Sequence, residues 1–181
     1  MFIGFIHSAL RNEALKMTAA NLSIVSVSYN PFMIHLNLLA FQNDLKYRQQ
    51  DGNSYLYDPV RKKWIQWTPE EIVRQLLLLY LLHSLKYSPS LVQEEKKLLV
   101  NGLTRRYDIL IYDRGMKPYL LVECKAPEIL INQDVFDQIA RYNSSLRVPF
   151  LLVSNGKEHY CCKMNYDDAS YTFLNNIPHP E

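Results

Sequence analysis

The hydrophobic pattern is clearest between residues 68 and 88, in the segment TPEEIVRQLLLLYLLHSLKYS. Its middle is apolar nearly all round, which indicates a helix that is covered on several sides. Thr68 is a suitable N-cap, and Pro69 suits the first helical position. Glu71 stands where a capping box places an acidic side chain. The pattern therefore predicts a buried helix that begins directly after Thr68.

Shorter segments on both sides of this helix have the pattern of strands, and one has the pattern of a second helix. NSYLYDPVRKKWIQW alternates aromatic and polar positions about an Asp-Pro turn and predicts a hairpin over residues 53–67. LVQEEKKLLVNGL predicts a short turn that leads into a strand. NQDVFDQIARYN predicts a helix with one apolar stripe. Four more strands are predicted in RRYDILIYD, KPYLLVECKA, VPFLLVSNG and HYCCKMNY, at residues 105–113, 117–126, 148–156 and 159–166.

The first 32 residues are weakly patterned, and Asn30-Pro31 separates them from MIHLNLLAF. Two interpretations are open. One is a loosely attached extension that precedes a translation start at Met33, and the other is a short helix packed on the domain. We expect an N-terminal extension over residues 1–32 and a single domain over residues 33–181, a size that supports one core.

Composition limits the partners, metal sites and cellular compartment expected for this domain. The formal charge of +2 neither demands nor excludes a nucleic-acid partner. The three cysteines and five histidines lack zinc-ligand spacing, so a zinc site is not expected. Reduced thiols in a bacterial-type cytoplasm are the simplest interpretation. The apolar run LLLLYLL is far shorter than the ~20 residues of a membrane span, and the N-terminus lacks the basic start of a secretory signal.

Two opposite charges interrupt the apolar strand pattern in YLLVECKAPE. Glu123 and Lys125 are two residues apart, so both leave the same side of a strand. An antiparallel hairpin with a loop over residues 114–117 pairs Tyr112 with Tyr119 and places Asp108 directly opposite Glu123. Leu110 and Leu121 then lie beneath the charges. A slip of one residue would separate the two acids, so the inference depends on this register.

Two facing carboxylates repel each other unless a cation lies between them. Oxygen ligands without His or Cys suit Mg²⁺ or Mn²⁺. Lys125 would then stand beside the ion, where it could hold a water or an anionic oxygen. A metal ion, an oriented water and an ammonium together suit hydrolysis of a phosphodiester. The alternative is a structural ion pair between Lys125 and one of the acids at the end of a sheet.

Asp108 followed by Glu123-Cys124-Lys125 on the next strand resembles the PD-(D/E)XK nuclease signature, with Tyr107 where that signature has proline. VQEEKKLLVNGLTRRYDILIYD, YLLVECKAPE and DQIARYN together resemble the N-terminal nuclease domain of type I restriction enzyme R subunits. The resemblance extends from Met33 to the C-terminus. It implies a restriction-endonuclease-like α/β fold, with a mixed central β-sheet flanked by helices.

The resemblance also implies roles for single residues. Asp108 and Glu123 would be metal ligands, helped by the backbone carbonyl of Cys124, and Lys125 would be the catalytic lysine. Glu95 matches the upstream acidic residue that, in the family, assists metal or water binding. Gln138 and Tyr142 match the family's Gln-x-x-x-Tyr helix motif. Glu95 as a solvated strand-start residue, and Gln138 and Tyr142 as surface and boundary residues, are the alternatives.

Basic residues near these motifs are candidates for DNA contacts. Arg105, Arg106 and Lys96 lie close to the proposed site in sequence and are expected to contact the DNA backbone, with ordinary surface charge as the alternative. The segment RKKWIQW could bind phosphates and stack on bases. We favour the simpler interpretation of a basic, solvated edge over two core indoles.

These observations predict a Mg²⁺- or Mn²⁺-dependent DNA endonuclease related to the R subunit N-terminal domain. No G-x-x-x-x-G-K-[ST] motif is present, so a nucleotide motor is not expected in this chain. The alternative is a non-catalytic DNA-binding or assembly module that serves separate restriction-modification subunits. Hydrolysis of RNA or another phosphodiester is a third interpretation. Small nucleases of this fold often need two copies to cut both strands, so a homodimer is also considered.

Overall fold

The computed structural model of the protein describes most of the chain after residue 31. The described residues are 32–95, 97–100, 103–132, 134–136, 139, 143 and 146–179, and among residues 97–105 the side chains are not described. The predicted extension over residues 1–32 therefore lies outside the described residues, apart from Phe32.

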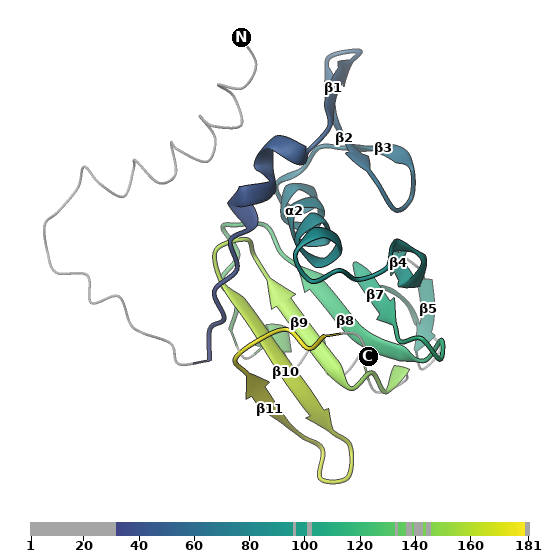
Figure 1. The fold of residues 1–181 in the computed structure, drawn as a ribbon, viewed down its shortest axis with the longest axis vertical. Helices are drawn as coiled ribbons and strands as arrows, with labels where there is room; N and C mark the ends of the chain where they lie inside the picture. The colour runs from purple at the N-terminus through teal and green to yellow at the C-terminus, as the bar shows by residue number, and fades with distance from the viewer. Residues whose placement is uncertain are drawn as a thin grey trace, which may run out of the picture. The chain divides into compact units, whose positions relative to one another are not determined.

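A six-stranded mixed sheet forms the centre of the domain (Figure 1). Its strand order is β11-β10-β9-β8-β7-β4, and only the β8–β9 pair is parallel among the strands of this sheet. The predicted α/β class with a mixed central sheet is confirmed. The strands are β4 (Val92–Glu94), β7 (Ile109–Tyr112), β8 (Pro118–Cys124), β9 (Phe150–Ser154), β10 (His159–Asn165) and β11 (Ser170–Leu174).

The helix α2 (Pro69–His83) forms as the hydrophobic pattern predicts. Thr68 caps it, because the Thr68 hydroxyl oxygen accepts a hydrogen bond from the Glu71 backbone N–H at 3.1 Å. In a capping box the Glu71 carboxylate would accept a hydrogen bond from the Thr68 backbone N–H. Here it instead accepts hydrogen bonds from the side chains of Arg74 and Gln75. No helix in the described residues is long and apolar enough to cross a membrane.

The two faces of the sheet bury separate sets of side chains because residues alternate along each strand. On β8, Val122 and Cys124 belong to the core that includes Leu77 of α2. Leu121 belongs to the opposite core, which includes Phe136 and Ile139 and has Val135 and Leu146 packed against it. Helical residues therefore cover both faces, as expected for this fold class. Burial of each such aliphatic side chain contributes roughly 1.5–3 kcal/mol to folding.

The pairing of β7 with β8 decides where the acidic residues lie. The predicted register is confirmed from Ile109–Val122 to Ile111–Leu120. It is wrong at the turn, where a bulge pairs Tyr112 with Pro118 instead of Tyr119. The strand predicted over residues 105–113 is also divided, because β6 (Leu103–Arg106) ends before β7 begins. Asp108 therefore lies in a bend at the entrance to β7.

The predicted hairpin over residues 53–67 is present as β2 (Asn53–Asp58) and β3 (Lys63–Gln66). A strand that the pattern did not indicate, β1 (Tyr47–Gln50), joins β2 to complete a separate three-stranded sheet. In Figure 1 this sheet extends beyond α2, away from the six-stranded sheet. The remaining elements are η1 (Leu38–Asp44), η2 (Pro89–Leu91) and β5 (Lys97–Val100), which pairs with β6. β11 was likewise not predicted.

A buried histidine links β9 to β10. His159 is 3% exposed, and its Nδ1 atom lies 2.8 Å from the Ser154 hydroxyl oxygen on the facing strand. Burial, with a smaller contribution from the charge of His35, lowers the pKa of His159 from 6.5 to about 4. The native state therefore keeps this imidazole neutral in mildly acidic solution.

We predict that His159 destabilises the fold as the pH falls from 6.5 to 4. In that window the unfolded chain binds a proton that the native imidazole rejects, so the free energy of unfolding decreases by up to about 1.4 kcal/mol per pH unit. Urea unfolding at several pH values should show a smaller dependence in His159→Gln. The exposed His83→Gln variant should keep the wild-type dependence. Equal slopes in wild type and His159→Gln would contradict the prediction.

Candidate functional site

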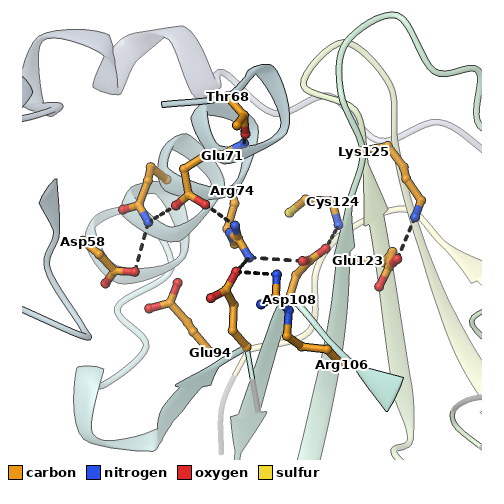
Figure 2. Close-up of polar contacts among 12 residues, drawn as sticks. Asp58, Thr68, Glu71, Arg74, Glu94, Arg106, Asp108, Glu123, Cys124 and Lys125 are labelled. Atoms are coloured by element: carbon orange, nitrogen blue, oxygen red, sulfur yellow. Dashed lines mark hydrogen bonds and ion pairs between the residues drawn. The ribbon is translucent and has the colours of Figure 1, made fainter. Parts of the chain in front are cut away.

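Asp108 is fixed between α2 and β8 by two hydrogen bonds (Figure 2). The Cys124 backbone N–H donates to its Oδ2 atom at 2.6 Å, and Arg74 Nη1 donates to its Oδ1 atom at 3.2 Å. The Asp108 carbonyl oxygen accepts a hydrogen bond from the Glu95 N–H at 3.0 Å, which continues the pairing of β4 with β7. The carboxylate is therefore oriented by α2 and β8, and the Asp108 backbone is held by the residue that follows β4.

Glu123 and Lys125 form an ion pair at the C-terminal end of β8. The Lys125 ammonium lies 2.7 Å from the Glu123 Oε1 atom, and both side chains are partly buried. The Lys125 backbone N–H donates to the Ser154 carbonyl oxygen at 2.8 Å, so β9 holds the chain in place where β8 ends. The ammonium is thereby kept beside the acid, as the E-x-K spacing predicts.

Burial is the largest cause that raises the pKa of both acids. Burial is the larger cause for Glu123, the charge of Asp108 adds to it, and the pKa of Glu123 reaches about 7. Burial also raises the pKa of Asp108, although the Cys124 N–H and Arg74 oppose this effect. The two carboxyl groups therefore interact across the β7–β8 pair. Lys125 stays protonated, because Glu123 raises the pKa of its ammonium despite partial burial.

A third acid contributes to the same electrostatic field. Glu70, in the first turn of α2, raises the pKa of Asp108 and of Glu123 through its charge. The described residues contain no group of three or more His, Cys, Asp or Glu side chains close enough to hold a metal ion. Two carboxylates are nevertheless enough for Mg²⁺, which is commonly bound by one or two carboxylates together with waters and substrate phosphates. The oxygen atoms of Asp108 and Glu123 fit that ion in type and charge.

Glu95 lies next to Asp108, but its carboxylate is occupied by arginines. Its Oε1 atom accepts hydrogen bonds from Arg74 at 2.8 Å and pairs with Arg106 at 3.0 Å, and its Oε2 atom accepts a hydrogen bond from Arg61. Although partial burial favours the neutral form, these three cations lower the pKa of Glu95. A role for Glu95 in metal binding would require some of these contacts to be displaced.

The arginines belong to a buried network that extends from α2 to the three-stranded sheet. Arg74 is 5% exposed and also donates to Glu71, while Arg61 lies 2.5 Å from the Asp58 carboxylate at the end of β2. Gln75 bridges the two ends of the network, donating to Asp58 at 3.1 Å and to Glu71 at 2.9 Å. Figure 2 shows this chain of contacts leading from β2 to Asp108.

Glu94 is the buried acid of this network that stays neutral at pH 7. Its side chain is fully buried, and burial, with the charge of nearby Asp58 as the next cause, raises its pKa to about 9. The pKa of Asp58 is instead lowered: burial opposes this, but the hydrogen bonds from the Arg61 backbone N–H and side chain outweigh it. The neutral Glu94 therefore reduces the excess of negative charge around the two arginines.

The other predicted site residues are only partly visible. Arg106 has a side chain that is 58% exposed, and Arg105 lies in β6, where its side chain is not described. Lys96, Gln138 and Tyr142 lie outside the described residues. Their roles stay predictions.

Sequence reasoning missed the residues that surround Asp108, chiefly Glu70 and Arg74. A signal was present in TPEEIVRQ, where Glu71, Arg74 and Gln75 share one side of a helix that is otherwise apolar. Charged side chains on a buried helix require partners, because they are rarely buried alone. The spacing could have indicated a polar cluster, but not the elements that complete it.

Residues 69–178 match the protein family described as the type I restriction enzyme R protein N terminus. This match spans more than half of the 181-residue chain. The chain belongs to this family. The match extends from α2 through β11 and includes Glu70, Arg74, Asp108, Glu123 and Lys125. The resemblance noted in the sequence is confirmed.

A solved structure is also similar to this R-family chain. It is a fragment assigned as an HsdR subunit of a type I restriction enzyme from Vibrio vulnificus YJ016, with 22% sequence identity and a TM-score of 0.35. The match covers 49% of this chain and 19% of that one, so the chain corresponds to a small part of the solved protein. A search of the curated proteins finds no match.

We predict that Arg74 is essential to the stability of this site, whereas Arg106 is not, although both contact the same Glu95 oxygen. Arg74→Gln should lower the free energy of unfolding by about 3–5 kcal/mol, because removal of a buried cation leaves buried carboxylates uncompensated. Arg106→Gln should change it by less than about 1 kcal/mol, because its ion pair is exposed. Urea unfolding at pH 7 measures both, and similar losses in the two variants would refute the distinction.

Proposed function

We propose that this domain is a Mg²⁺-dependent DNA endonuclease of the R protein N-terminal family. The observation that carries the proposal is the electrostatic interaction of Asp108 with Glu123, which lie next to the Ile109–Val122 pair of β7 and β8, together with the Lys125 ammonium 2.7 Å from Glu123. Two partly buried acids with raised pKa values, one of them raised by the charge of the other, suit a cation and a phosphate beside a fixed ammonium better than they suit a structural role.

Asp108 and Glu123 would hold the ion, with help from the Cys124 carbonyl oxygen. A bound Mg²⁺ would lower the pKa of a water and offset the negative charge that develops on the phosphate. Lys125 carries a proton throughout, so it would donate hydrogen bonds to the attacking water or to a phosphate oxygen rather than accept a proton. Gln138 and Tyr142 would support the site or the scissile phosphate.

The Cys124 amide has a second role in this proposal. It donates to Asp108 Oδ2, and an ionised carboxylate has further lone pairs that can bind an ion. The Cys124 hydrogen bond therefore orients Asp108 without preventing it from acting as a metal ligand. Arg74 acts in the same way on Oδ1. A carboxylate that is oriented in advance loses less freedom when an ion binds, which favours binding.

The second candidate is a non-catalytic DNA-binding or assembly module with the same fold. It is favoured by the direct Lys125–Glu123 ion pair and by the occupation of Glu95 by three arginines. Both features leave fewer carboxylate oxygens for a metal ion. Separate restriction-modification subunits would then supply the activity, and DNA would remain a partner.

We predict that wild-type protein binds Mn²⁺ or Mg²⁺ and that Asp108→Asn binds it much more weakly. The amide keeps an oxygen that can accept the Cys124 hydrogen bond, but it lacks the negative charge that attracts the ion. Calorimetric titration of each ion into both proteins measures the effect. The exposed Asp167→Asn variant is the matched control and should titrate as wild type does. Equal ion affinity in wild type and Asp108→Asn would overturn the metal assignment.

We also predict that Lys125→Ala abolishes plasmid cleavage, with a loss of at least ~100-fold in rate, because the ammonium contacts the charge of the transition state. Cleavage in Mg²⁺ or Mn²⁺ is followed on supercoiled plasmid, with circular dichroism to verify the fold. Lys117→Ala removes an exposed lysine from the β7–β8 turn and should cut normally. Undiminished cutting by Lys125→Ala would exclude this mechanism. DNA binding without cleavage by the wild type would favour the second candidate.

A further inference from the structure

The outer face of the three-stranded sheet combines aromatic rings with cations. Pairing places Arg48 opposite Tyr55 and Tyr57 opposite Trp64, so these side chains share one face. Leu56, which alternates with them on β2, is 1% exposed and points to the interior. The face with the rings is therefore directed away from the core, and its aromatic side chains are partly exposed.

The Arg48 guanidinium group is ordered by aromatic stacking. Its central carbon lies 4.5 Å from the centroid of the Trp64 ring and 5.5 Å from that of Tyr55. Among the described residues no carboxylate pairs with Arg48, in contrast to the buried Arg61 and Arg74. Stacking uses the face of the guanidinium and leaves the N–H groups at its edge available, in the fork that fits a phosphate.

A second cation is placed in the same way at the next position along the face. The Lys46 ammonium lies 5.4 Å from the centroid of the Tyr57 ring, and that ring meets Trp64 edge-on at 5.4 Å. Lys46 and Tyr57 also line a cavity of about 640 Å³ between η1, β2 and α2. Lys46 therefore lies beside a hollow in the surface and two residues from Arg48 along the chain.

The charge of this segment favours an anionic partner. Between residues 46 and 67 the exposed charged residues are four cations and one carboxylate, namely Lys46, Arg48, Lys62, Lys63 and Asp51. The other two charged residues of the segment, Asp58 and Arg61, pair with each other in the interior. The exposed part of the sheet therefore carries a charge of about +3, in a chain whose total is +2.

This sheet is also firmly connected to the acidic site. Asp58 ends β2, and Arg61 lies in the β2–β3 turn, where it donates to Glu95. Glu95 is in turn bonded to Arg74, which contacts Asp108. A strand of nucleic acid bound on the sheet would thus be held at a fixed position relative to the acids.

We propose that the outer face of β1–β3 binds the phosphate backbone of DNA, with Arg48 and Lys46 as its principal contacts. The inference rests on the DNA substrate of the proposed function but not on cleavage. It replaces the interpretation of RKKWIQW as only a solvated edge. Trp64 acts as the platform that orders Arg48, and each cation contacts a phosphate group rather than a base edge, so the binding carries no sequence preference.

The test compares two double variants that each remove two exposed cations. Lys46→Ala/Arg48→Ala changes the proposed face, and Arg114→Ala/Lys117→Ala changes the β7–β8 turn. Fluorescence anisotropy with a labelled 20-base-pair duplex, in EDTA and at several salt concentrations, measures affinity without cleavage. Thermal unfolding verifies that both variants fold.

The face variant should bind the duplex at least ~10-fold more weakly at low salt, and its plot of log affinity against log salt should be less steep by about 1.8, since each phosphate contact contributes about 0.9. The turn variant should match the wild type. Equal affinity and slope in the face variant and wild type would overturn the inference, as would failure of the wild type to bind the duplex. Stronger binding to RNA or to a single strand, with the same loss in the face variant, would overturn the choice of duplex DNA.

The result is separable from the fate of the nuclease proposal. Wild type that cuts plasmid while the face variant binds normally would retain the nuclease and reject the surface. Binding that depends on Lys46 and Arg48, without cleavage in Mg²⁺ or Mn²⁺, would retain the surface and reject the nuclease.

Discussion

Two buried guanidinium groups organise the part of the domain that contains the acidic site. Arg74 and Arg61 lie among carboxylates supplied by the three-stranded sheet, α2, β4 and the entrance to β7. Removing such charges from water is costly, and the cost is offset only when each charge has close partners. The elements that supply these partners must therefore keep their mutual positions, because displacement of any one of them leaves a buried charge uncompensated.

This constraint gives the Asp108 carboxylate its orientation. The β7–β8 register brings the acid beside Glu123, but Asp108 lies in a bend before β7, where strand alternation no longer fixes its direction. Arg74 from the helix and the Cys124 amide from the sheet provide that direction instead. Glu123 and Lys125 lie within and directly after β8, so their positions depend on the sheet alone. The site thus combines a rigid strand with an anchored bend.

The same network relates the three-stranded sheet to the site. Without the Asp58 and Arg61 contacts, a small sheet outside the main one would have only its apolar inner side to fix its position. An ion pair with directional hydrogen bonds restricts the orientation of the three-stranded sheet more strongly than apolar contacts do. Under the proposed function, this arrangement would align a bound phosphate backbone with Asp108 and Glu123, which offers a reason for retaining costly buried charges.

The sequence by itself determined the elements whose signals are local. Helix α2 with its Thr68 cap, most of the strands, and the placement of Lys125 beside Glu123 at the end of β8 follow from periodicity and spacing. The family follows from the motifs around them. Tertiary structure alone decided the partners of Arg74, the arginines around Glu95 and the third strand β1. Each of these depends on contacts between segments that are distant in sequence. The periodicity of a helix or strand indicates which of its sides is buried, but it does not indicate which charged side chain of another segment contacts that side.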